Sequence, residues 1–213
     1  MPLDPSPEQA ASFSAACKGD GDAARMKGLL LNLDYVNKGF VGVLQSSRYV
    51  RGSLEDAKRG AEEDAAILRS KGFEVVRKKV EAVSTNDGVP KTMDDAKRSP
   101  DDRYFEFHLL IDGKSGPISN EDVASLRSIA SEMSRRLDQP VPLSYNALKP
   151  AQRFLNLRAR RMGLDDAMVH VRELESLIEK TGVLGVVKVI AEYICFDDNR
   201  AIERWNQIVA DRM

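Results

Sequence analysis

Residues 104–111, YFEFHLLI, constrain the fold more than any other stretch because polar and apolar side chains alternate along them. Side chains of successive residues point to opposite faces of a β-strand. One face would carry Phe105, Phe107, Leu109 and Ile111, and the other would carry Tyr104, Glu106, His108 and Leu110. Such alternation predicts a strand in a sheet that is covered on one face. The carboxylate and the imidazole predict that the second face is polar.

A helix predicted over residues 119–138 supplies the cover for the apolar face. Ser119 stands at its start and Asp122 follows three residues later, which is the arrangement of a capping box. Its apolar residues are spaced three and four apart and form one stripe, namely Val123, Leu126, Ala130, Met133 and Leu137. A helix with one apolar stripe packs that stripe against a sheet.

The segments after this helix complete a recognisable order of elements. They are a short extended piece at 140–148, a strand at 153–161, a helix at 164–182 and a final strand at 183–196. With the strand at 104–111 and its helix, the order is βαββαβ, which is that of a ferredoxin-like or split-βαβ unit. The sequence therefore predicts an α+β fold with a ferredoxin-like domain over residues 103–196.

An upstream segment repeats part of this pattern. LEDAKRGAEEDAAILRSKGFEVVRKKV, which begins at Leu54, aligns without gaps on LDDAMVHVRELESLIEKTGVLGVVKVI, which begins 110 residues later at Leu164. A strand before the first of these segments, and one at its end over residues 73–83, would make a βαβ half-repeat over residues 35–83. Internal similarity of this kind predicts a partial duplication of the fold.

Three further segments have simpler interpretations. Residues 1–34 have apolar residues on either side of the turn KGDGD and predict a helical hairpin. Residues 84–102 are polar, contain two prolines and show no periodicity, which predicts a flexible loop or linker. Residues 197–213 predict a C-terminal amphipathic helix, with Ile202, Trp205 and Val209 on one side.

Composition narrows the function classes. The chain has 32 Lys and Arg residues against 33 Asp and Glu residues. Its overall charge therefore gives no general attraction to nucleic acids or to anionic membranes. The longest apolar run is interrupted by Lys188 and Glu192 and is too short to span a bilayer. Cys17 and Cys195 suit a reducing compartment and have no zinc-site spacing, so we expect a cytoplasmic protein.

The candidate site follows from the pairing of the two central strands of the predicted sheet. If their apolar residues share the helix-covered face, their polar residues share the other face. That face would bring together Tyr104, Glu106, His108, Asn156, Arg158 and Arg160, with Lys188 and Glu192 from the last strand. Arginine binds phosphate and carboxylate with two parallel hydrogen bonds. The leading prediction is therefore a binding module for a small anionic ligand.

Several alternatives remain open at this point. His108, held by Glu106, would suit a general acid or base in a phosphate-ester hydrolase. The open face would equally suit a protein-interaction or homo-oligomer surface, or a solvated face with cross-strand charge pairs. RNA binding has weak support, because Tyr104 is the one aromatic candidate on the predicted face of the first strand. No cofactor or metal site is predicted, since the chain has only two histidines and its GKSG at 113–116 lacks P-loop spacing.

Overall fold

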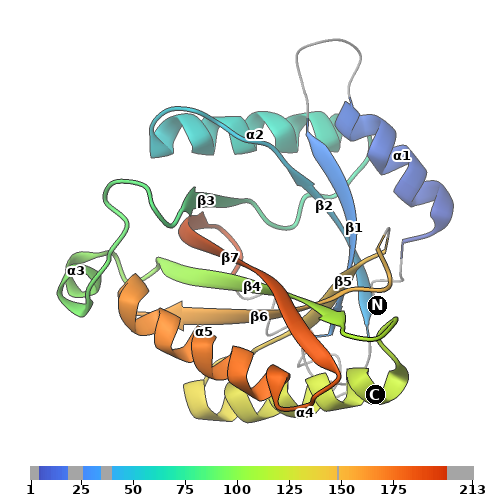
Figure 1. Ribbon diagram of the computed structural model, residues 1–213. Coiled ribbons are helices and arrows are strands. Elements are labelled where there is room, and N and C mark those ends of the chain that lie inside the picture. Colours follow the sequence, from blue (N-terminus) through green and yellow to red (C-terminus); the bar gives the residue numbers. More distant parts are fainter. Residues whose placement is uncertain (1–4, 19–25, 35–39, 148, 201–213) are drawn as a thin grey trace.

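The computed structural model describes residues 5–18, 26–34, 40–147 and 149–200 of the chain. These residues form a mixed α+β fold around one curled sheet, whose seven strands follow the order β2-β1-β5-β6-β4-β7-β3 (Figure 1). Every neighbouring pair in the sheet is antiparallel. The strands are β1 (Lys27–Asp34), β2 (Val41–Ser47), β3 (Lys79–Val83), β4 (Tyr104–Gly113), β5 (Leu143–Asn146), β6 (Arg153–Arg160) and β7 (Leu184–Asp197). The helices are α1 (Pro7–Lys18), α2 (Leu54–Ser70), α3 (Met93–Arg98), α4 (Asn120–Leu137) and α5 (Leu164–Glu179).

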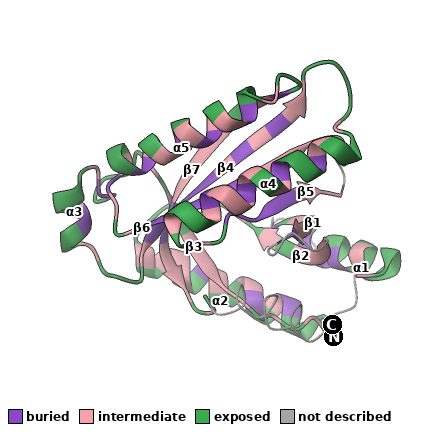
Figure 2. Cartoon of the chain, turned by 90° about the horizontal axis from the view of Figure 1, so that it is seen from below, coloured by how far each residue is buried: buried purple, intermediate pink, exposed green. Residues whose placement is uncertain are grey.

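The main core lies between the central strands and the helices α4 and α5. The alternation along β4 has the predicted consequence, because Phe105, Phe107, Leu109 and Ile111 are all fully buried. They pack in one cluster with residues of both helices, including Leu126, Met133, Leu174 and Ile178. Figure 2 shows buried positions recurring along β4, α4 and α5. The α+β class and the covered face of β4 are therefore confirmed.

The predicted start of α4 is also observed. The Ser119 hydroxyl accepts a hydrogen bond from the Asp122 amide at 3.2 Å, and the Asp122 carboxylate accepts one from the Ser119 amide at 2.8 Å. These two bonds satisfy amide groups that have no partner within the helix. The local sequence thus determines where this helix begins.

Two additions extend the four strands β7, β4, β6 and β5. The β1–β2 hairpin pairs with β5 at one end, and β3 pairs with β7 at the other end. Helix α2 connects β2 to β3, which are the two outer strands of the sheet. It lies on the side of the sheet away from α4 and α5, where the curl brings the two edges toward it (Figure 1).

The predicted N-terminal helical hairpin is wrong in its second half. Residues 7–18 are helical, but Lys27–Asp34 form strand β1. A Cβ atom at Gly28 would lie 3.2 Å from the Cys17 sulfur, so the glycine lets α1 pack closely on the strand. Side chains from α1, α2 and the chain entering β1 make a second, smaller core, namely Phe13, Ala16, Cys17, Met26 and Leu68.

Residues 84–102, for which a flexible loop or linker is predicted, contain a short helix. This helix is α3, with Thr92 and Asp95 forming a capping box. The carbonyl oxygens of Pro90 and Lys91 accept hydrogen bonds from the first two amides of α5 at 3.1 and 3.0 Å. Gly163 provides no capping side chain for α5, so this loop caps α5 with its backbone.

The boundaries of two other predicted elements change. The strand predicted over residues 73–83 begins only at Lys79. Phe73 instead packs edge-to-face on Phe13, with ring centroids 5.3 Å apart, and so belongs to the second core. The C-terminal helix predicted over residues 197–213 falls mostly outside the described residues, and Asp197 is the last residue of β7.

Candidate functional site

The predicted site residues lie on the face of β4, β6 and β7 that is turned away from α4 and α5, and we call it the polar face. Direct cross-strand partners on it are Tyr104 and Arg160, Glu106 and Arg158, and His108 and Asn156. On β7, Glu192 lies opposite Glu106 and Lys188 lies opposite Leu110. The antiparallel register of these three strands therefore places all eight predicted residues along one surface.

Glu106 is an almost completely buried carboxylate of this face, with 1% of its surface exposed. It accepts hydrogen bonds from Arg158 Nε at 2.7 Å and from Lys79 Nζ at 2.6 Å. Burial alone would raise the pKa of Glu106, but the charges of Lys79 and Arg158 hold it well below its ordinary value. Glu106 is therefore an ionised carboxylate that is committed to two cations.

Strand β3 contributes two residues that were not among the predicted site residues, Lys79 and Glu81. Lys79 Nζ lies 2.6 Å from Glu81 Oε1 as well as 2.6 Å from Glu106, so one ammonium group links two carboxylates. Burial and the neighbouring Glu192 carboxylate raise the pKa of Glu81. The sequence contains the signal for this pair, since Lys79 and Glu81 alternate in KVEAV, but the sheet position of β3 was needed to see it.

His108 is held through both ring nitrogens. Its Nδ1 lies 2.6 Å from Asn156 Oδ1, and its Nε2 lies 3.1 Å from Glu192 Oε2. The Asn156 amide nitrogen donates to the carbonyl of Pro142 and to the Ser144 hydroxyl, both at 3.0 Å. Because a carbonyl can only accept, the amide oxygen must face the histidine, and Nδ1–H must be the donor.

The second nitrogen of His108 faces the Glu192 carboxylate, an arrangement that favours the doubly protonated imidazolium. Burial opposes this charge, but the hydrogen bond to Glu192 and the charge of Glu106 raise the pKa of His108. The same hydrogen bond lowers the pKa of Glu192. Glu106 lies 3.9 Å from Nε2, so the nearest carboxylate is Glu192 and not the predicted partner Glu106.

Tyr104 and Arg160 form the end of the polar face. The Tyr104 hydroxyl donates to Asp197 Oδ2 at 2.9 Å, and Arg77 donates to both oxygens of the same carboxylate at 2.9 and 2.5 Å. The guanidinium carbon of Arg160 lies 4.4 Å from the centroid of the Tyr104 ring, a cation–π distance. Tyr104 is only 1% exposed, so its ring is not available for stacking with a base.

Two cations of the face differ from the rest. Within the described part of the chain, neither Arg160 nor Lys188 lies within ion-pair distance of a carboxylate, whereas Lys79, Arg158 and His108 all do. Lys188 is exposed at the surface. Arg160 is partly buried and is positioned by the tyrosine ring.

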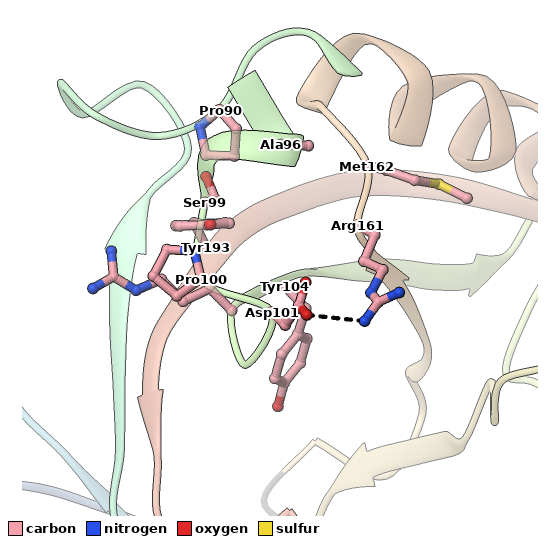
Figure 3. A pocket seen from close by; sticks show the side chains of 10 residues that line it. Pro90, Ala96, Ser99, Pro100, Asp101, Tyr104, Arg161, Met162 and Tyr193 are labelled. Atoms are coloured by element: carbon pink, nitrogen blue, oxygen red, sulfur yellow. Dashed lines mark hydrogen bonds and ion pairs between the residues drawn. The ribbon is translucent and has the colours of Figure 1, made fainter. Parts of the chain in front are cut away.

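Two hollows on the described surface lie beside the segment of residues 88–103. One of them is a crevice of about 10 Å³ that ten residues line, among them Tyr104 and Tyr193. The ion pair of Asp101 with Arg161, at 3.0 Å, borders it (Figure 3). The crevice has room for about one water molecule. A wider hollow of about 380 Å³ lies between residues 88–90 and α3 and is open to solvent. Neither hollow is bordered by the ionised cluster around His108.

Comparisons of this chain with known proteins identify no family for it. Searches of protein-family models, of curated proteins and of solved structures gave no significant match to this chain. Among the described residues, no group of three or more potential metal ligands is found. No described helix has the length and apolar character to cross a membrane.

Proposed function

We propose that this protein is a non-catalytic binding module whose polar face holds a small anion, with a phosphate or carboxylate group, at Arg160. The observation that carries the proposal is the Arg160 guanidinium, which is fixed on the Tyr104 ring and has no carboxylate partner among the described residues. A guanidinium whose position is already fixed loses little conformational entropy on binding an anion.

The neighbours of Arg160 support this choice of position. Tyr104 is itself held by its hydrogen bond to Asp197, which two further bonds fasten to Arg77. The cations deeper in the face are already neutralised by Glu106, Glu81 and Glu192. An incoming anion would therefore find its strongest free field at Arg160.

The same contacts argue against the hydrolase alternative. A general base needs a nitrogen or oxygen with a free lone pair directed at its substrate. Both nitrogens of His108 donate to partners within the chain, and Glu106 accepts from two cations. Neither residue keeps an unused acceptor directed away from the protein, so the geometry favours binding over catalysis.

Inorganic phosphate tests the proposal. We expect the Arg160 side-chain NMR resonances to shift on phosphate addition, with saturable binding by isothermal titration calorimetry. Arg160→Gln should abolish the saturable binding. Arg51→Gln removes the same charge from an exposed loop position and should leave the saturable phosphate binding unchanged. Absence of saturable binding, or equal loss in both variants, would overturn the proposal.

We also propose the finer description of the fold. The order β7-β4-β6-β5 with α4 and α5 on one face supports a ferredoxin-like unit within residues 103–196. Helices α2 and α5 begin at Leu54 and Leu164, the same 110-residue offset as in the sequence alignment, which supports a partial duplication. Two free thiols, at Cys17 and Cys195, support a cytoplasmic location.

A further inference from the structure

The ionised cluster around His108 joins four strands of the sheet. Glu106 comes from β4, Arg158 from β6, Glu192 from β7, and Lys79 and Glu81 from β3. Strand β3 lies at the edge and pairs only with residues 192–197 of β7, with a bulge between Val80 and Glu81. The cluster thus connects a short edge strand to the centre of the sheet.

Apolar contacts contribute little to the attachment of β3. Val83 is 55% exposed, and no residue of the strand is fully buried. The polar side chains make longer connections, because Lys79 reaches across β7 to Glu106 on β4. The neighbouring contacts of Arg77 with Asp197, and of Lys78 with Asp198, hold the chain just before the strand.

When Glu106, Glu81 and Glu192 are all ionised, the charges of the cluster balance only if His108 is protonated. The cations are then Arg158, Lys79 and His108, and the anions are Glu106, Glu81 and Glu192. If His108 loses its proton, Glu192 loses its cationic partner next to the Glu81 carboxylate. Like charges that are partly buried at short distance repel strongly, because the local dielectric constant is low.

We propose that His108 is a proton-controlled latch for the β3 edge of the sheet. Protonated His108 holds Glu192, so that Lys79 and Glu81 can fasten β3 to β7 and β4. Deprotonated His108 releases Glu192, and once Glu81 is ionised as well, the repulsion between the two carboxylates loosens β3. The latch is independent of anion binding at Arg160.

The pH dependence has a definite sign. The pKa of His108 is higher in the closed protein than in an open form, where its partners are lost. Closure of β3 is therefore complete below the pKa of the open form and weakens as the pH rises through the pKa of the closed form. Within that window, the opening equilibrium should rise by about tenfold for each pH unit.

Hydrogen exchange of backbone amides measures this opening directly. We expect the protection factors of residues 79–83, corrected for intrinsic exchange rates, to fall as the pH is raised above the ordinary histidine pKa of about 6.5. The amides of α5, which packs in the main core on the opposite face, should keep their protection over the same range. Invariant protection of residues 79–83 would overturn the proposal.

Matched variants distinguish the contributions of the two histidines of the chain to this pH dependence. His108→Gln should give low protection at residues 79–83 at every pH, whereas His170→Gln, on α5, should keep the full pH dependence. If His108→Gln fails to fold, the NMR titration midpoint of His108 in the unaltered protein must match the midpoint for the amides of β3. A mismatch, or a pH dependence that His170→Gln abolishes, would refute the latch.

Discussion

Glu106 lies in the middle of β4, between Lys79 at 2.6 Å and Arg158 at 2.7 Å. A carboxylate on a solvated sheet face would tolerate neutralisation, because water would replace its partners. Here the carboxylate is almost fully buried, and its removal leaves two cations without their counter-charge. The sequence pattern alone suggests a solvated Glu106, whereas its neighbours in the structure make it a buried carboxylate that stabilises two cations.

Glu106→Gln should destabilise the protein by roughly 3–5 kcal/mol, as the loss of one partner from a buried ion pair does. Urea denaturation followed by circular dichroism measures the change in unfolding free energy. Glu55→Gln, at an exposed position of α2, should change it by less than about 0.5 kcal/mol. A similarly small effect of Glu106→Gln would show that solvent reaches its carboxylate.

The effect of Glu106→Gln should also depend on pH. The pKa of Glu106 is lowered in the folded protein, so its stabilising contribution is present above the pKa of the unfolded chain. That contribution is lost as the pH falls toward the pKa of the folded state. The stability difference between the variant and the unaltered protein should therefore shrink in acid.

At the scale of single elements, the start of α5 depends on residues that lie 74 positions earlier in the chain. The carbonyls of Pro90 and Lys91 cap its first amides, and a Cβ atom at Gly163 would lie 2.3 Å from the carbonyl carbon of Thr92. The absence of a side chain at Gly163 is thus what allows the loop to approach. A larger residue must push the loop away from the helix.

Gly163→Ala should therefore detach the loop and α3 from the N-terminus of α5. We expect limited proteolysis within residues 84–102 to become faster, and the unfolding free energy to fall by about 1–3 kcal/mol from the lost caps and the steric conflict. Met93→Ala, at an exposed position of α3, is the control and should leave the cleavage rate unchanged. Equal cleavage rates in all three proteins would contradict the capping role of the loop.

Sequence patterns predicted correctly those elements that are determined by residues close together in the sequence. The alternation along β4, the stripe of α4 and its Ser119 cap are all encoded within a few residues. Strand β1 was missed because three successive leucines suit either a helix or a strand until the partners of Gly28 are known. The capping loop before α5 and the Lys79–Glu106 contact join residues distant in sequence, so no short window could reveal them.

At the scale of the whole molecule, one sheet joins two cores of unequal size. The main core contains the fully buried side chains of β4, β6, α4 and α5, whereas the second core has five buried residues. The two regions meet where β1 pairs with β5, from Leu31 to Asp34, and where buried Asp34 bonds Arg127 of α4 at 2.8 Å. This short ladder and ion pair, with surface contacts of α2 such as that of Glu62 with Lys78, connect the two regions, so the smaller region should be able to open alone.

Two phenylalanine truncations test this unequal stability. Phe107→Ala empties a fully buried site of the main core and should lower the global unfolding free energy by about 3–5 kcal/mol, which reduces hydrogen-exchange protection throughout the sheet. Phe13→Ala removes the contact with Phe73 in the second core and should reduce protection in α1, β1 and β2. The protection of β4 and β6 should stay at the level of the unaltered protein in Phe13→Ala. If Phe13→Ala instead weakens β4 and β6 as much as β1, the two cores unfold as a single cooperative unit, and the β1–β5 connection is stronger than its few contacts indicate.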